Sequence, residues 1–385
     1  MENKNLTFIE ASSIVTGYGI GGGVMAAPYL ASLSGIIPTL IILLLAFGIS
    51  LIFHLMTAEI MLRDGHNEQI IEMFSKYMLK GTITKYILWF LFAVIVLSFI
   101  ASLSAFIAGG GENINNLFPA IPLWAAHCIV YLIAAGVVFF GLKAIGISEK
   151  YGVSAIFVFV IILLIASLRH GLSFRPEVTG AFKYQMALFG MMMFSFFALF
   201  SVPQVVKGLS WNKKLIPKAV AFGMALNCII IFAIVMICVG ASGHVTRFAM
   251  NGLANSIGGW IKYFSSLFVL LAMLTTYWSV SFALAVVVQE RLGWGQRISW
   301  LVATLPSFIV VISRATDFLG FMQIAGGTIA ILIVIMMIPL YNIVKKQGAV
   351  KEPEWQLDFF GKPVFQALVI IAFILMAAGS LVKVD

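Results

Sequence analysis

Apolar residues follow one another in this chain in long stretches, each bounded by a short polar segment. The stretches are about 20 residues long, the length of helix that crosses a ~30 Å hydrocarbon core. We delimit eleven of them, at residues 9–31, 35–60, 84–110, 122–142, 150–168, 184–206, 217–241, 262–288, 298–314, 318–342 and 363–383. The pattern predicts an all-α membrane protein with about 11 transmembrane helices.

The composition agrees with this interpretation and excludes a water-soluble globular protein. Hydrophobic residues make up 62% of the 385 residues and charged residues 10%, which leaves too little polar surface for a soluble domain. Residues 1–385 are therefore expected to form a single transmembrane domain in a cell membrane, the plasma or inner membrane. The first span lacks a basic leader and a small-residue cleavage site, so we expect it to be retained.

The net charge of +9 is explained by topology and requires no nucleic-acid partner. Of the 24 Lys and Arg residues, 17 fall in the N-terminal segment and in every second connection between spans. Cytoplasmic connections carry the excess of positive charge in membrane proteins. The distribution predicts a cytoplasmic N-terminus and a C-terminus outside.

A short amphipathic segment follows the second span. Ile70, Ile71, Phe74, Tyr77 and Met78 share one face if the segment is helical. Such a helix is typical of a membrane surface, and we expect it to lie on the inner one.

The first span contains an unusual run, GYGIGGGVMAAP, at residues 17–28. Glycine costs about 1 kcal/mol relative to alanine inside a helix, and proline about 3 kcal/mol. Two interpretations remain open for this span alone: the helix unwinds here, or its small residues form a packing face for a neighbouring helix.

The sixth span is irregular as well, with Ser195, Ser201 and Pro203 inside its apolar run. Proline removes a backbone donor and frees carbonyls one turn before it, near residues 198–200. Two interrupted helices at matching positions are typical of a transporter built from inverted repeats, with its substrate at the breaks. We assign the first repeat to residues 9–168, the second to 184–342, and an extra helix to 363–383.

Four separate segments resemble one known family. They are residues 17–28 in span 1, Ala105–Gly111 in span 3, Ser195–Pro203 with the following WNKKLIPKA, and Ala325–Gly327 in span 10. Their order and spacing resemble the hydroxy and aromatic amino acid permeases, within the amino acid/auxin permease grouping of the APC superfamily. The resemblance implies a LeuT-type fold of five plus five helices with helices 1 and 6 broken. Members often have a histidine in the span 6 break, where this chain has Leu199.

The predicted break in span 1 provides groups for a zwitterionic substrate. Unpaired amides at the start of its second half, aided by the helix dipole, suit a carboxylate. We assign this contact to Gly21, Gly22, Gly23 and Val24. The ammonium group is expected at the carbonyls near Thr16 and Gly17 and at those from Phe197 to Phe200.

The substrate side chain is expected between spans 3, 6, 8 and 10. The candidates are Ser102, Phe106, Phe197, Leu199 and Phe200. With 33 phenylalanines in the chain, each of these rings has lipid-facing or core packing as its alternative role.

The resemblance also places Thr275 and Thr276 of span 8 where LeuT-type carriers hold a sodium ion together with span 1 carbonyls. Sodium is thus the one cofactor it implies. The alternative is that these hydroxyls bond within or between helices. All carboxylates fall near predicted span ends, so His54 and Lys150 are the candidates for proton coupling. Helix packing is the alternative for His54, and contact with the inner surface for Lys150.

These features together predict an ion-coupled symporter that imports an amino acid, most readily an aromatic, hydroxy or other neutral one. Sequence motifs of metalloproteases, serine hydrolases and P-loop pumps are missing, which disfavours an enzyme. A nontransporting amino acid sensor and a carrier of another small amine or neutral solute remain as alternatives. The sequence leaves sodium and proton coupling undecided.

Overall fold

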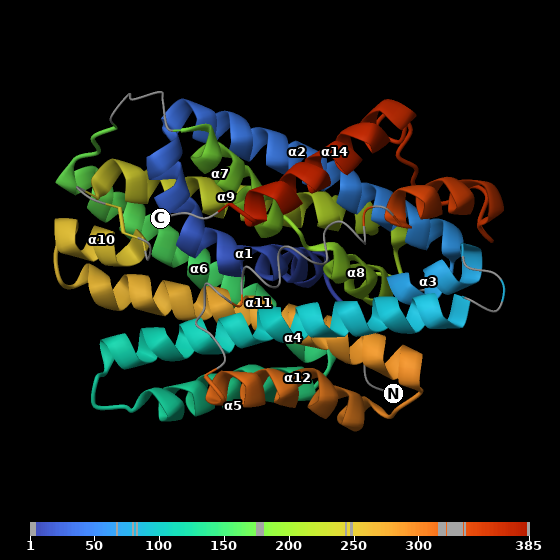
Figure 1. Ribbon diagram of the computed structural model, residues 1–385, viewed down its shortest axis with the longest axis horizontal. Coiled ribbons are helices and arrows are strands. Elements are labelled where there is room, and N and C mark those ends of the chain that lie inside the picture. The colour runs from blue at the N-terminus through green and yellow to red at the C-terminus, as the bar shows by residue number, and fades with distance from the viewer. Residues whose placement is uncertain are drawn as a thin grey trace.

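The chain is described here by a computed structural model that covers residues 5–66, 68–78, 81, 84–174, 181–242, 245–246, 249–314, 321, 334 and 336–382. The helices of this part are α1 (Phe8–Ser34), α2 (Ile36–Asp64), α3 (Ile70–Tyr77), α4 (Thr84–Leu117), α5 (Leu123–Phe139), α6 (Leu142–His170), α7 (Phe182–Ser195), α8 (Val202–Gly208), α9 (Ile216–Ala241), α10 (Ala249–Ile257), α11 (Ile261–Leu292), α12 (Gln296–Ile312) and α14 (Pro363–Ser380). Residues 336–347 are helical as well. Figure 1 shows most of them running side by side along the long axis.

The predicted spans overlap these helices, with boundaries that differ by up to eight residues; most of span 318–342, with its Ala325–Gly327 motif, lies outside the described residues. Among the described residues, seven spans are long and apolar enough to cross a membrane, with α7 and α8 taken together as one, and α1 is an eighth if it is taken as one bent span. Helices α5 and α12 are shorter apolar helices. The prediction of an all-α membrane protein is confirmed.

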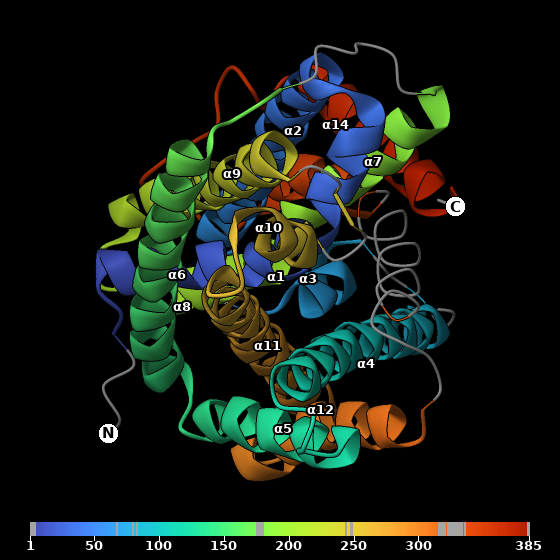
Figure 2. The ribbon, with the colours of Figure 1, turned by 90° about the vertical axis from the view of Figure 1, so that its left-hand side faces the viewer.

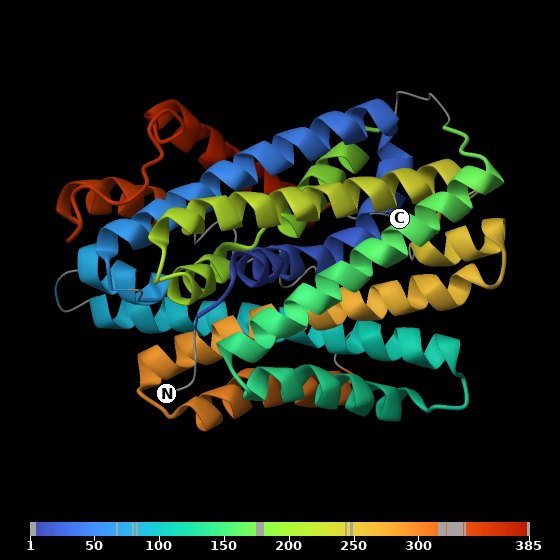
Figure 3. The same ribbon diagram turned by 180° about the vertical axis from the view of Figure 1, so that it is seen from behind.

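Helix α1 lies in the middle of the bundle (Figure 2), where it packs against α6, α7, α9 and α11. From Glu10 to Met25, every residue of α1 whose burial is described is buried. Helices α5 and α12 form a pair on one side of the molecule, against α4 and α11. Helix α6 crosses the back of the bundle obliquely (Figure 3). The glycine-rich segment of α1 is thus enclosed by other helices.

The chain is helical through the whole of α1, which differs from the unwound segment expected there. Thr7 caps its first turn, with Glu10 completing the capping box. The helix bends by 51° between Phe8–Gly21 and Gly23–Ser34. A bend keeps most backbone groups paired inside the helix, which costs less among apolar neighbours than a fully unwound segment.

The sixth span is interrupted within the bundle. Helix α7 ends at Ser195, a 3₁₀ turn (η1) covers Leu199–Ser201, and α8 starts at Val202 with Pro203 in its first turn. Proline is tolerated at the start of a helix because the amide it removes has no helical partner there. The irregular segment is residues 196–201.

The apolar face of helix α3, expected from the sequence to face the inner membrane surface, is buried against other helices. Ile70, Ile71, Met73 and Phe74 are each at most 1% exposed, and α3 packs against α4 and α11. The amphipathic pattern reflects burial against protein, because a helix of eight residues fills a gap between longer ones.

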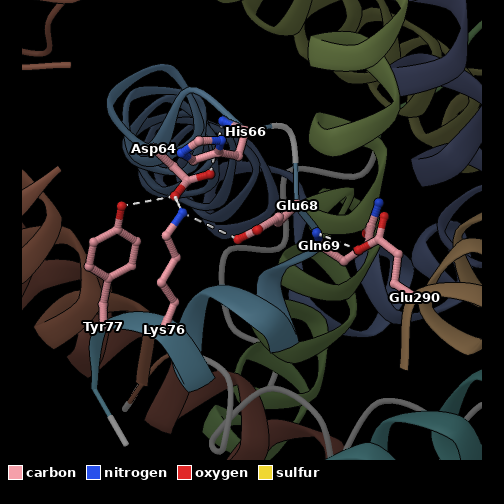
Figure 4. A network of polar contacts seen from close by, with 7 residues as sticks. All are labelled: Asp64, His66, Glu68, Gln69, Lys76, Tyr77 and Glu290. Atoms are coloured by element: carbon pink, nitrogen blue, oxygen red, sulfur yellow. Dashed lines mark hydrogen bonds and ion pairs between the residues drawn. The ribbon is translucent and has the colours of Figure 1, made fainter. Parts of the chain in front are cut away.

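Polar contacts fix α3 at both ends (Figure 4). Asp64 at the end of α2 accepts from Lys76 Nζ at 2.7 Å and from Tyr77 Oη at 2.9 Å, and Glu290 of α11 accepts from the Gln69 amide at 2.9 Å. Burial, aided by the bond to Asp64, raises the pKa of Tyr77 to about 12. Tyr77 therefore remains a donor at neutral pH, and α3 links α2 to α11.

Candidate functional site

The glycines of α1 lie on two faces of the helix. Each residue advances an α-helix by about 100°, so residues four apart share a face. Gly17 and Gly21 face α6, α4 and α11, whereas Gly19 and Gly23 face α7 and α9. Both pairs have the small-xxx-small spacing that lets helices approach closely. The packing interpretation therefore holds for these four glycines; the surroundings of Gly22 lie outside the described part.

Gly21 is where three helices meet. A Cβ on Gly21 would lie 2.6 Å from Thr276 Oγ1 of α11 and 2.8 Å from Phe106 Cε1 of α4. A larger residue would have to displace both side chains. The structure thus brings together the predicted carboxylate contact, the predicted aromatic side chain and one of the predicted hydroxyls.

Thr276 is inserted into the backbone of α1. Its Oγ1 accepts from the Gly21 amide at 2.9 Å and lies 2.7 Å from the Gly17 carbonyl oxygen, to which it is placed to donate. These two backbone groups are the i and i−4 pair that an α-helix joins directly. A side chain inserted into that ladder is a known cause of helix bending, and the bend of α1 follows at Gly21.

Side chains from other helices satisfy the backbone groups freed in the sixth span. The Ala198 amide donates to His54 Nε2 of α2 at 2.9 Å, and the Ser195 carbonyl accepts from Asn227 Nδ2 of α9 at 2.9 Å. The Ala198 carbonyl accepts from Ser201 Oγ at 2.6 Å. An interrupted helix is tolerated at membrane depth where protein groups provide these partners.

Both ring nitrogens of His54 are engaged. Nδ1 lies 2.6 Å from the Ser50 carbonyl, to which it donates, while Nε2 accepts from Ala198. This arrangement defines one neutral tautomer, since a protonated ring would turn Nε2 into a donor facing another donor. His54 therefore makes contacts of the kind that the packing alternative requires, and it supports the break.

Two of the proposed aromatic side chains lie near the bend. Phe106 contacts Gly21, and Phe200 packs edge-to-face on Phe99 of α4 with ring centroids 4.8 Å apart. Phe99 is one of the residues that the sequence analysis missed. It lies seven residues before Phe106, two turns along the same helix, and this spacing is the signal that identifies it.

The other side-chain candidates are placed differently. Phe197 packs against Phe53 of α2 and Phe373 of α14, on the far side of the break from Phe200. Ser102 bonds to the Ser98 carbonyl of its own helix at 3.0 Å, and Leu199 is fully buried in η1. The structure does not bring Phe197 to Gly21.

Three more of the predicted site residues lie in α1 and α11. Thr16 Oγ1 lies 3.0 Å from the Gly223 carbonyl of α9, so it faces away from Thr276. Thr275 Oγ1 bonds to the Ala272 carbonyl of its own helix at 3.0 Å. Val24 is fully buried after the bend. Thr275 thus bonds within α11, whereas Thr276, with which it was predicted to form a pair, bonds to α1.

Glu149, and not Lys150, reaches the interior. Lys150 is half-buried, with Nζ 4.9 Å from the ring centroid of the exposed Tyr151. Glu149 is fully buried, which contradicts the expectation that all carboxylates lie near span ends. The predicted fifth span began at residue 150, whereas α6 begins at Leu142. Two more turns of helix place Glu149 inside the bundle, on the buried stripe of Ile145 and Gly152.

The two ends of the bundle differ in access to the bend. At the end that holds α3 and α8, the Leu6 side chain fills the notch between Gly146 and Gly208, and Trp211 Nε1 donates to the Leu6 carbonyl at 3.1 Å. At the opposite end, a cavity of about 290 Å³ is lined by Met25, Gly109 and residues of α10 and α11, among others. Among the described residues, Leu6 is thus packed tightly at the first end, and the second end is hollowed.

The arrangement is that of a membrane transporter with the LeuT-type fold. The structure aligns with Mhp1, a nucleobase-cation-symport-1 family transporter solved closed with bromovinylhydantoin bound, at a TM-score of 0.70 and 12% identity, over 98% of this chain and 91% of that one. It aligns with MhsT in complex with L-phenylalanine at a TM-score of 0.66 and 14% identity, over 97% and 98%. No curated protein matches the chain in sequence.

The model of the tryptophan/tyrosine permease family matches residues 4–379. The chain belongs to this family. It is a multi-pass membrane transporter of the amino acid permease type, and not an enzyme, as the sequence predicted.

Proposed function

We propose that this protein imports an aromatic amino acid by alternating access, driven by a gradient of a monovalent cation. The observation that carries the proposal is the meeting of Phe106, Thr276 and Gly21 at the bend of α1. The Phe106 ring can pack against an aromatic substrate side chain, and the backbone amides at the bend can bind its carboxylate. The family membership and the L-phenylalanine bound to MhsT support this substrate class.

In the proposed complex, the substrate carboxylate bonds to the amides of Gly21 to Val24. Its ammonium group bonds to the Gly17 carbonyl and to carbonyls of residues 197–200. The ring lies against Phe106, with Phe99 and Phe200 behind it. Thr276 Oγ1, which already bonds to Gly21 and Gly17, adjusts as the substrate takes over these backbone groups.

The proposed orientation has the N-terminus in the cytoplasm and the C-terminus outside. The charge distribution supports it, because the basic residues gather at the end that holds α3 and α8. The cavity beside Met25 and Gly109 then opens to the outside. Substrate enters there, and movement of one set of helices against the other opens the Leu6 end.

The test is the thermal stability of the purified protein with each of the twenty amino acids, in sodium and in potassium. A ligand that binds only the folded state raises stability by mass action, by about 2.7 kcal/mol at 100 times Kd. We expect tyrosine, tryptophan or phenylalanine to give the largest shift. Gly21→Ala is expected to abolish it, whereas Gly48→Ala, where an added Cβ has open space, retains it.

Uptake into proteoliposomes then separates a carrier from a sensor. A carrier accumulates the amino acid that stabilises it, while a sensor binds it without accumulation. If none of the twenty amino acids stabilises the protein, the proposal is wrong, and amines and nucleobases are the next ligands to screen.

A further inference from the structure

Glu149 has a surrounding unlike that of any other carboxylate described for this chain. It is fully buried, two turns inside α6, and lies between α1 and α11. A methyl group on Gly17 would overlap its carboxylate, so the carboxylate packs directly on the α1 backbone. The substrate groups proposed above begin at that same glycine.

The carboxylate has one polar partner within the described residues. Ser279 Oγ of α11 bonds to Oε1, and Oε2 has no hydrogen-bond partner. Ser279 Oγ also lies 3.5 Å from the Ile14 carbonyl of α1. A proton on Oε1 would therefore be donated to Ser279, whose own hydrogen turns to Ile14.

No cation neutralises Glu149 among the described residues. Lys143 of α6 pairs with Glu10 of α1 at 2.7 Å instead. The other titratable or charged groups on helices packed against α6 are Tyr18 and Tyr29 on α1, His127, Cys128 and Tyr131 on α5, Lys207 on α8, Lys218, Cys228 and Cys238 on α9, and Lys262, Tyr263, Tyr277, Glu290 and Arg291 on α11. None of them is bonded to the Glu149 carboxylate.

An ionised carboxylate in this position would be a buried charge without a counter-ion, which is strongly unfavourable. The neutral acid is the form that fits the closed helices. If α1 moves away from α6 and α11, water reaches the carboxylate and the ionised form becomes tolerable. Closure around Gly17 and protonation of Glu149 therefore favour each other.

We propose that Glu149 binds the proton whose downhill movement drives substrate uptake; this rests on the proposed function above. A proton from the outer side joins the carboxylate to give the neutral acid, the helices close over substrate and acid, and the proton leaves to water when the other end opens. The carboxylate packs directly on Gly17, where a methyl group would overlap it, so a change in its protonation is felt at the α1 backbone.

The test uses the full chain in proteoliposomes, with radiolabelled L-tyrosine and L-tryptophan as probes and pyranine as an internal pH indicator. Wild-type protein is expected to accumulate a probe at least tenfold when the outside is acidic, and to acidify the lumen as the probe enters. Glu149→Gln should lose accumulation and acidification while still exchanging internal for external probe. Glu354→Gln, the same change at a partly exposed carboxylate, should behave as wild type.

Undiminished proton-driven accumulation in Glu149→Gln would overturn the proposal. So would wild-type uptake that responds to a sodium gradient and moves no protons, although the proposed function would stand. Absence of probe binding and exchange in the wild type would instead refute the proposed function itself, and this inference with it.

If Glu149→Gln yields no folded protein, variants of two serines of α11 test the proposal instead. Ser279→Ala removes the partner of Glu149 and should alter the pH dependence of uptake. Ser281→Ala is the control, because the Ser281 hydroxyl is buried and bonds to the Tyr277 carbonyl of its own helix. An identical pH dependence in both variants would contradict the proposal.

Discussion

At the scale of single residues, His54 shows how one side chain stabilises an interrupted helix. The Ala198 amide has no place in the hydrogen bonding of either α7 or α8, and His54 Nε2 accepts from it at 2.9 Å. A buried amide without an acceptor costs about 1–3 kcal/mol. The histidine thus allows the sixth span to stop being helical within the bundle.

We expect His54→Ala to lower the free energy of unfolding by about 1 kcal/mol, because the Ala198 amide loses its side-chain acceptor and keeps the Phe196 carbonyl at 3.0 Å. His54→Gln should recover part of the loss, since its amide oxygen reaches about as far as Nε2. Thermal unfolding in detergent measures both. The control is His66→Ala, at an exposed position; an equal effect there would show that His54 has no special role.

At the scale of elements, the bend of α1 depends on another helix. Thr276 Oγ1 of α11 bonds to both the Gly21 amide and the Gly17 carbonyl of α1. The glycines supply the space for this insertion, since a Cβ at Gly21 would collide with the hydroxyl. The bend is therefore a property of the pair α1 and α11.

Thr276→Val keeps the shape of the side chain and removes its hydroxyl. We expect the Gly21 amide and the Gly17 carbonyl to bond to each other, and substrate binding to weaken by about tenfold, or ~1.4 kcal/mol. Calorimetric titration of the purified protein measures this loss.

Two other threonine variants serve as comparisons for Thr276→Val. Thr57→Val, at a buried threonine bonded to its own helix, should bind as wild type. Thr275→Val should also leave binding unchanged. Equal losses at Thr275 and Thr276 would instead favour an ion held by both hydroxyls.

At the scale of the whole molecule, contacts at one end hold the N-terminal segment against the bundle, and we expect them to restrict access to the bend from that side. Leu6 is 2% exposed, and its amide donates to the Gly208 carbonyl at 2.9 Å. Close by, Glu59 of α2 accepts from Tyr341 Oη at 2.7 Å and from the Leu357 amide at 3.0 Å. These contacts join the N-terminal segment and the connection before α14 to the bundle.

Leu6→Ser should loosen this end, because burial of a leucine side chain contributes about 2 kcal/mol. We expect faster hydrogen–deuterium exchange over residues 5–16, with little change at the α10 end. Ile9→Ser, at a position 47% exposed, is the matched control. Unchanged exchange in Leu6→Ser would show that Leu6 does not close the path.

Much of the architecture was predictable because it follows from local pattern. A run of about 20 apolar residues can pair its backbone hydrogen-bonding groups in a membrane only as a helix. The spans could therefore be predicted from the positions of these runs. Glycine density at residues 17–23 and Pro203 marked both irregular helices. The amphipathic segment 70–78 was recognised as a helix, but its pattern does not distinguish lipid from protein, and its apolar face packs against α4 and α11.

The sequence by itself determined the helices, the class of protein and the two places where helices deviate. Only the tertiary structure decided which side chains meet there. Thr276 and His54 act on backbone atoms about 255 and 144 positions away, and Glu149 gained its burial from two helices distant in sequence. The local sequence pattern determines which face of a helix is apolar. Which residue of another helix a given side chain contacts depends on how the helices pack. The bend of α1 and the buried acid beside it are therefore properties of the folded bundle.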